Sequence, residues 1–216
     1  RKLIMAISKI DVSNMLDETL PVANGGTGVT TAADLANTGN MVKIATATFS
    51  ADASVEFTSL SDYNCYEFHF YNMKATTDGN NDLLFSMSTD GTNYTVPMYT
   101  SNIYTYNKTD GTASGGSFSS GAFASENDTN GVIMSERFGG GSAETQNGKI
   151  IIYDASSTTK YKHYQTIYSG YHSEDYSWGA YLTGHGQTTS ALAGIKISIG
   201  SGTIATGTVV QYGLKV

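Results

Sequence analysis

The sequence has one cysteine, two prolines and few charged residues. The single cysteine, Cys65, excludes an intrachain disulfide and cysteine-rich zinc motifs, and we expect it to be a small buried hydrophobe. Charged residues make up 14% of the 216 residues, against about 25% in a typical globular protein. No apolar run approaches the roughly 20 residues that a membrane-spanning helix needs, so we expect no membrane insertion.

The charge balance argues against nucleic acid as a partner. Twelve basic residues face 19 acidic ones, which gives a net charge of −7. The basic residues are scattered along the chain, whereas nucleic-acid binding depends on clustered lysine and arginine. We therefore expect no nucleic-acid partner.

The histidines and carboxylates do not form a recognised catalytic or metal-binding motif. His163, His172 and His185 lie near Glu174 and Asp175, but no His-x-x-x-His or His-Glu-x-x-His spacing occurs. No Gly-x-Ser-x-Gly nucleophile motif is present either. We therefore expect no metal, no cofactor and no catalytic residue.

Paired carboxylates are the remaining route to an enzyme, because glycosidases use two acids. The pairs Glu126/Asp128 and Glu174/Asp175 both fall in polar loop stretches, where acids are usually solvated. The sequence therefore favours a non-enzymatic protein, with a polysaccharide depolymerase as an alternative.

The first 40 residues differ from the rest of the chain. Residues 1–19 carry Leu3, Ile7 and Ile10 at helix-like spacing over barely two heptads, which suits the end of a coiled coil or a disordered tail. Residues 20–32 follow, with a proline and three glycines in four positions, and predict an extended entry and a tight turn. We therefore divide the chain into a leader and glycine-rich connector, residues 1–40, and a second domain, residues 41–216.

Period-two patterns dominate this second domain. Tyr66, Phe68 and Phe70 share one face of a predicted strand, while polar residues alternate with them. About eleven such short strands, separated by turn residues, predict an all-β protein with a jelly-roll-like β-sandwich. Residues 110–124 are rich in glycine and serine and are predicted to form a functional or mobile loop. Residues 170–175 are predicted to form a second loop.

Aromatic residues gather in or beside these two loops. Aromatic rings stack on sugar rings and offer rigid contact area at a low entropy cost. An alternative is that they are ordinary strand residues packed between two sheets, which the sequence favours for Trp178. The candidate binding residues are Tyr104, Tyr106, Tyr171, His172, Tyr176 and Trp178.

Three short motifs resemble one family. Residues 20–28 (LPVANGGTG) are similar to an element that joins the shaft of bacteriophage tail fibres to a more distal domain. Residues 195–203 (IKISIGSGT) with 211–215 (QYGLK) resemble the ending of phage tail and fibre β-sandwich domains. Residues 66–73 (YEFHFYNM) with 84–91 (LFSMSTDG) resemble the first strand pair of those domains. The chain is thus similar to the distal domain of a phage tail fibre or receptor-binding protein.

The resemblance implies a role in host attachment. It implies a homotrimer that joins other tail or virion proteins through its N-terminal side. It also implies binding to a host surface glycan or outer-membrane component, and a place in the virion tail fibre after assembly in the host cytoplasm. A structural virion protein without host binding, such as a capsid decoration or baseplate component, is the alternative.

Overall fold

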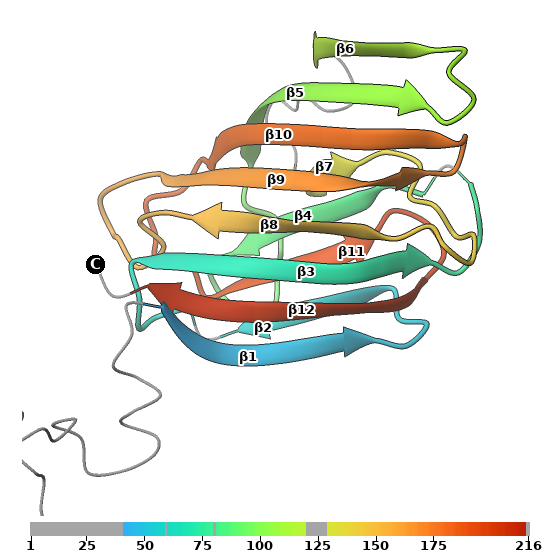
Figure 1. The fold of residues 1–216 in the computed structure, drawn as a ribbon. Helices are drawn as coiled ribbons and strands as arrows, with labels where there is room; N and C mark the ends of the chain where they lie inside the picture. Colours follow the sequence, from blue (N-terminus) through green and yellow to red (C-terminus); the bar gives the residue numbers. More distant parts are fainter. Residues whose placement is uncertain (1–40, 59, 80, 120–128, 215–216) are drawn as a thin grey trace, which may run out of the picture. The chain divides into compact units, whose positions relative to one another are not determined.

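The computed structural model describes residues 41–58, 60–79, 81–119 and 129–214 as an all-β sandwich (Figure 1). The predicted leader and connector, residues 1–40, lie outside the described residues. The described strands are β1 (Met41–Phe49), β2 (Ser54–Thr58), β3 (Cys65–Ala75), β4 (Leu83–Ser88), β5 (Met98–Lys108), β6 (Ser114–Ser119), β7 (Val132–Ser135), β8 (Gln146–Ile152), β9 (Lys162–His172), β10 (Tyr176–Gly186), β11 (Gly194–Ile199) and β12 (Ile204–Leu214).

The strands form a large and a small antiparallel sheet. The large sheet has the order β1-β12-β3-β8-β9-β10-β5-β6, and the small sheet has the order β2-β11-β4-β7. The pairs β1·β12, β2·β11, β3·β8 and β4·β7 are nested within one another along the chain and alternate between the two sheets. Nested pairs wound in this way make a jelly roll, which confirms the predicted fold class. We call these eight strands the jelly-roll core.

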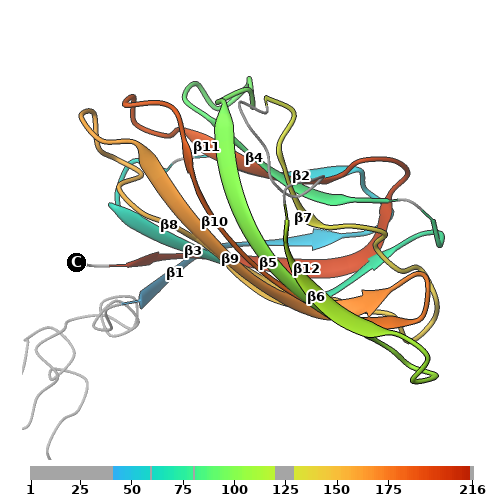
Figure 2. The same cartoon turned by 90° about the horizontal axis from the view of Figure 1, so that it is seen from above.

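Two additional hairpin-forming strand pairs, β5–β6 and β9–β10, widen the large sheet beyond β8. We call these four strands the extension. In Figure 1, β5 and β6 continue the large sheet upward past β7, the last strand of the small sheet. Figure 2 shows the long, bent β5 and β10 running side by side along this part of the sheet.

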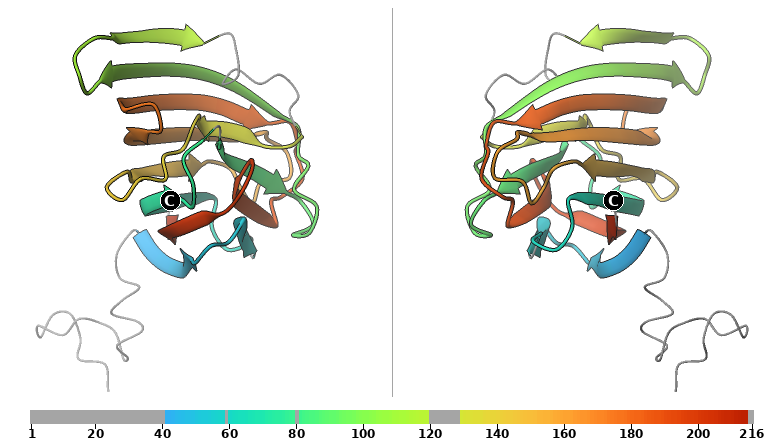
Figure 3. Two further views of the ribbon diagram at one scale, coloured as in Figure 1. Left: turned by 90° about the vertical axis from the view of Figure 1, so that its right-hand side faces the viewer. Right: turned by 90° about the vertical axis from the view of Figure 1, so that its left-hand side faces the viewer.

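The two sheets face each other (Figure 3), and the core is built from inward side chains of both. The predicted face of Tyr66, Phe68 and Phe70 on β3 is completely buried. Phe68 meets Phe57 of the small sheet edge-on, with ring centroids 5.3 Å apart. Cys65 is buried and unpaired with another cysteine, as expected. Further buried residues of this layer include Leu83, Phe85, Met87, Ile150, Ile152, Ile195 and Ile197.

The structure differs from the predicted elements in the loop regions. Strand β6 lies inside the 110–124 segment that was expected to be a loop, and β2 was not predicted. Strands β9 and β10 extend to His172 and from Tyr176, so only three residues turn between them. The reason is that β9 and β10 pair along their whole length, from His172 opposite Tyr176 to Lys162 opposite Gly186.

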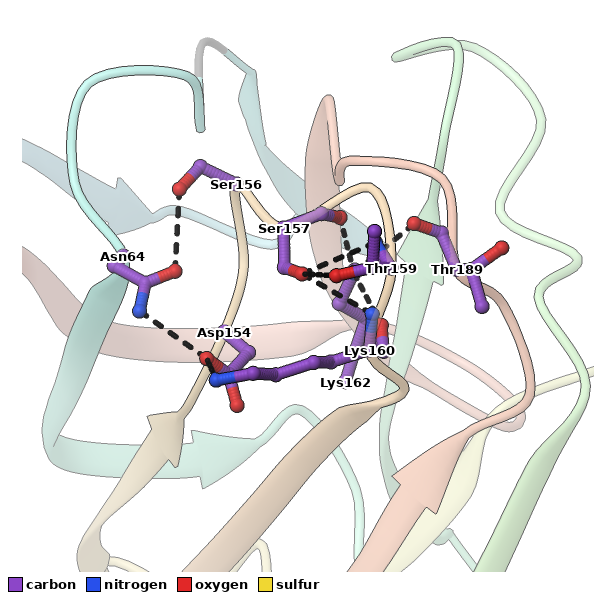
Figure 4. Close-up of polar contacts among 8 residues, drawn as sticks. All are labelled: Asn64, Asp154, Ser156, Ser157, Thr159, Lys160, Lys162 and Thr189. Atoms are coloured by element: carbon purple, nitrogen blue, oxygen red, sulfur yellow. Dashed lines mark hydrogen bonds and ion pairs between the residues drawn. The ribbon is translucent and has the colours of Figure 1, made fainter.

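A buried lysine ties together two connections at one end of the sandwich (Figure 4). The Nζ of Lys162 donates hydrogen bonds to the backbone carbonyls of Ser157 at 2.6 Å, Lys160 at 2.7 Å and Thr189 at 3.4 Å. These carbonyls belong to the β8–β9 and β10–β11 connections. Burial lowers the pKa of Lys162, while the three acceptors compensate for the loss of water around the ammonium group.

Candidate functional site

Five of the six candidate aromatic and histidine side chains line one hollow of about 220 Å³. It lies at the inner face of the extension. Tyr106 of β5 is opposite Trp178 of β10, and Tyr176 of β10 is opposite His172 of β9. Tyr104 precedes Tyr106 by two residues, so both side chains point to the same face. The β-register therefore brings together residues that are up to 74 positions apart in the sequence.

The hollow exists because the two sheets have different widths. Strand β7 is the edge of the small sheet, whereas the large sheet continues through β9, β10, β5 and β6. At the far edge of the large sheet, inward side chains of the extension therefore have no strand of the small sheet directly opposite them. Tyr104, Tyr106 and Tyr176 are half-buried there, whereas Phe68 and Phe85 in the middle of the core are completely buried.

The aromatic wall of the hollow is a set of near-parallel rings. The rings of Tyr104 and Trp178 have centroids 4.8 Å apart and an angle of 12° between their planes. Those of Tyr106 and Trp178 are 6.1 Å apart at 16°. Tyr176 meets Tyr106 edge-on at 5.4 Å. Trp178 is only 8% exposed, so the expectation that it packs inside the protein is largely met. Mutual stacking makes this wall rigid.

A glycine on the edge strand positions one of these rings. Gly115 of β6 lies opposite Tyr106 in the sheet. A Cβ atom at Gly115 would lie 3.0 Å from the Tyr106 hydroxyl and 3.1 Å from its Cζ atom. The ring therefore occupies the space that a side chain on β6 would fill. The glycine-rich sequence of β6 thus serves the geometry of the hollow.

The polar side of the hollow comes from Glu136, Arg137 and Glu174. The segment after β7 reaches the end of β9 through an isolated bridge between Phe138 and His172. Arg137 forms an ion pair with Glu174 and has a φ of 49°, a left-handed conformation that is uncommon for arginine. Such backbone conformations concentrate at functional sites.

Burial shifts the pKa of two groups of the hollow in opposite directions. Desolvation, with the charge of Asp82 acting in the same direction, raises the pKa of Glu136. Burial, reinforced by the positive charge of Arg137, lowers the pKa of His172 to about 4. The imidazole is therefore neutral at pH 7. Its Nδ1 accepts a hydrogen bond from the backbone N–H of Glu174 at 3.1 Å, which leaves the proton on Nε2.

Tyr171 is the candidate that the structure does not place in the hollow. It follows Gly170 and precedes His172 on β9, so its side chain points to the opposite face of the sheet. Its hydroxyl donates a hydrogen bond to Asp175 at 3.2 Å. The expectation of a loop at residues 170–175 concealed this alternation.

Two residues of the hollow, Glu136 and Arg137, were not among the sequence candidates. The bridge between Phe138 and His172 brings both residues to the hollow. It joins positions 34 residues apart, and no local sequence pattern predicts such a contact. Glu174 was recognised only as one of two adjacent acids. Its ion pair with Arg137 gives it a defined place at the hollow.

The arrangement is suited to binding a sugar ring. A rigid aromatic wall offers stacking, and the carboxylates, guanidinium and imidazole offer directional hydrogen bonds. Among the described residues, no group of three or more His, Cys, Asp or Glu side chains is arranged to hold a metal ion. No helix in the described part of the chain is long and apolar enough to cross a membrane.

Comparisons with known proteins do not place the chain in a family. No protein-family model matches it, and the search of curated proteins found no match. Among solved structures, it is similar to the infectious bursal disease virus VP2 subviral particle at 12% sequence identity and a TM-score of 0.13. That alignment covers 81% of this chain but only 41% of the other.

Proposed function

We propose that the chain is a non-enzymatic receptor-binding domain of a phage tail fibre, which attaches the virion to a bacterial surface glycan through the aromatic hollow. The observation that carries the proposal is the convergence of five side chains on one hollow: Tyr104, Tyr106, Tyr176, Trp178 and His172. The motifs that resemble phage fibre domains support its place in a virion, and they are the reason to expect a homotrimer.

The chemistry of the hollow fits a pyranose ring better than a charged ligand. One face of a sugar ring is apolar enough to stack on an aromatic wall, while its hydroxyls need donors and acceptors at the edge. Arg137 is already paired with Glu174, and His172 is neutral at pH 7. Glu136 adds a carboxylate. An anionic sugar would therefore meet no unpaired cation among the described lining residues.

Trp178, the single tryptophan of the chain, is a direct probe of the proposed site. We expect its fluorescence to change saturably when purified bacterial capsule or lipopolysaccharide fractions that contain the cognate glycan are titrated into the protein. Tyr104→Ala and Tyr106→Ala should each weaken this binding by about two- to tenfold, since each removes a ring contact worth roughly 0.5–1.5 kcal/mol.

Tyr181→Ala is the matched control. Tyr181 lies on β10 as Trp178 does, but it points to the outer face and is 37% exposed. This variant should bind like the unmodified chain. Equal losses in Tyr181→Ala and Tyr104→Ala would move the binding site away from the hollow. If the chain neither binds polysaccharide nor attaches to bacteria from a broad host panel, the structural virion protein becomes the better assignment.

A second candidate function is glycoside hydrolysis, because two carboxylates, Glu136 and Glu174, line the same aromatic hollow. A carboxyl group with a raised pKa, as Glu136 has, suits a general acid. The ion pair of Glu174 with Arg137 instead suits a fixed binding group. Release of reducing ends from a bound polysaccharide, abolished by Glu136→Gln, would establish the enzyme; binding without such release supports the adhesion domain.

A further inference from the structure

A second cluster of aromatic and imidazole rings lies on the outer face of the large sheet. His163 of β9 and His185 of β10 are directly opposite each other, and their ring centroids are 5.9 Å apart. They line a hollow of about 300 Å³ together with Tyr153, which follows β8, and with Gln165 and other residues of β9 and β10. We call His163 and His185 the histidine pair. It shares no lining residue with the proposed glycan site.

The ring of His185 is held in place by two tyrosines. It stacks on Tyr99 with centroids 5.2 Å apart and planes at 10°, and on Tyr161 at 5.4 Å and 18°. Such stacking restricts rotation of the imidazole ring about its side-chain bonds. A restrained ring loses less entropy when it binds a ligand than a freely rotating one.

The histidine pair differs from the other two histidines of the chain in its polar contacts. Both ring nitrogens of His69 are engaged, with Glu67 at 2.6 Å and Tyr71 at 3.2 Å. His172 accepts a backbone hydrogen bond. Within residues 41–58, 60–79, 81–119 and 129–214, the ring nitrogens of His163 and His185 have no hydrogen-bond partner. Their lone pairs are therefore available.

The spacing of the two rings fits coordination of one ion. A metal bound at the usual zinc–nitrogen distance of about 2.0–2.1 Å lies roughly 3.2 Å from the centre of an imidazole ring. Two rings on one ion then have centroids at most about 6.4 Å apart, and tetrahedral coordination brings them to about 5.2 Å. The observed separation of 5.9 Å lies between these values.

We propose that His163 and His185 form a surface site for a divalent late transition-metal ion, of the class of Zn²⁺, Ni²⁺ and Cu²⁺. Neutral imidazole is a preferred ligand of these ions, whereas Mg²⁺ and Ca²⁺ prefer oxygen. The pair supplies two ligands, and water fills the remaining positions because the hollow is open to solvent.

The test uses the full chain without an affinity tag and Zn²⁺ or Ni²⁺ alone as the probe. Calorimetric titration should show one ion bound per chain, and the ion should raise the melting temperature because it binds the folded state. His163→Gln and His185→Gln should each weaken binding by at least about tenfold, which corresponds to about 1.4 kcal/mol. His69→Gln is the matched control on the same outer face and should leave the affinity unchanged.

His185→Phe protects the test against a folding defect. It keeps an aromatic ring between Tyr99 and Tyr161 and removes only the ligand atoms, so it should fold and fail to bind the ion. No stoichiometric binding by the unmodified chain would overturn the proposal. Binding that survives in the double variant His163→Gln/His185→Gln would overturn it as well, and so would an equal loss in His69→Gln.

Discussion

The jelly-roll core and the extension share the large sheet, yet its inward face differs in burial between the middle of the core and the far edge of the extension. In the core, Phe68 and Phe85 point between two sheets and are completely buried. In the extension, Tyr104 and Tyr106 occupy equivalent inward positions and are half-buried. The covering layer explains this difference in burial: a second sheet packs over Phe68 and Phe85, whereas the small sheet has ended opposite Tyr104 and Tyr106, where amphipathic rings suit a partly exposed surface.

The chain connectivity explains how the two regions coexist. The four nested pairs of the core remain intact because β5–β6 follows β4 and β9–β10 follows β8, and both hairpins add to the free side of β8. The extension therefore adds a surface without interrupting the core. We therefore expect the core to contribute most of the free energy of unfolding and the extension to contribute most of the ligand contacts.

The largest expected effect comes from Phe68→Ala in the core. Phe68 is completely buried and joins the two sheets through Phe57, so its truncation should cost about 3–5 kcal/mol in the free energy of unfolding. Urea denaturation measures this. Ile167→Ala, on the outer face of β9 where the side chain is 50% exposed, is the control and should change stability by less than about 1 kcal/mol. Similar costs in both variants would contradict the assignment of stability to the core.

The next prediction concerns His172 in the extension and the dependence of the free energy of unfolding on pH. The pKa of His172 falls from its usual value near 6.5 to about 4 in the folded protein. Below pH 6.5 the unfolded chain binds a proton that the folded chain does not, so stability falls as the pH drops from about 6.5 to 4. The contribution lost at the end of this range is about 3 kcal/mol.

His172→Gln removes this titration. The free energy of unfolding of the variant, measured by denaturation at several pH values, should depend less on pH between 6.5 and 4 than that of the unmodified chain. His69→Gln serves as the control, because the half-buried ring of His69 pairs with Glu67 and does not line the hollow. An unchanged slope in His172→Gln would mean that His172 is not held neutral by the hollow.

The next prediction concerns Lys162, which links the two regions. Strand β9 of the extension begins at this residue, and β10 is followed by β11 of the core. Lys162→Met retains much of the side-chain volume but leaves three carbonyl acceptors without their charged donor, which should cost about 1–3 kcal/mol. Lys160→Met is the matched control: its exposed ammonium pairs with Asp154 and should contribute less than about 1 kcal/mol. Equal effects in thermal or urea denaturation would contradict the role of the buried ammonium.

Period-two alternation made much of the core predictable from the sequence. Tyr66, Phe68 and Phe70 are large and apolar at every second position, and only a buried strand face explains them. Strand β6 was not predicted because its glycines and serines show no alternation of apolar and polar residues. It pairs with β5 through the backbone. The pairing of β3 with β8 was also not predictable, since pairing between strands some 80 residues apart leaves no local sequence pattern.

The hollow was predictable in its aromatic half and not in its polar half. Tyrosines and a tryptophan near Gly/Ser-rich segments indicated a binding surface, and alternation along β5 and β10 places them on one face. Arg137 gave no such signal, because its position depends on a single bridge beside it. Tyr171 shows the limit of residue type alone: one step along β9 separates it from the hollow.

Gly115→Ala should have the smallest effect on stability and tests the extension by itself. The added Cβ would lie 3.0 Å from the Tyr106 hydroxyl, so the ring must shift by a few tenths of an ångström. The free energy of unfolding should change by less than about 1 kcal/mol, because alanine suits a strand slightly better than glycine and offsets part of the strain. The displaced ring should nevertheless weaken polysaccharide binding by about threefold and alter the emission of Trp178, on which it stacks.

Gly179→Ala on β10 is the control, since the nearest atom to its added Cβ is 3.6 Å away and belongs to Thr105. If both variants leave the emission and the affinity unchanged, the glycines of β6 do not position the aromatic wall, and the extension binds through rings that tolerate displacement.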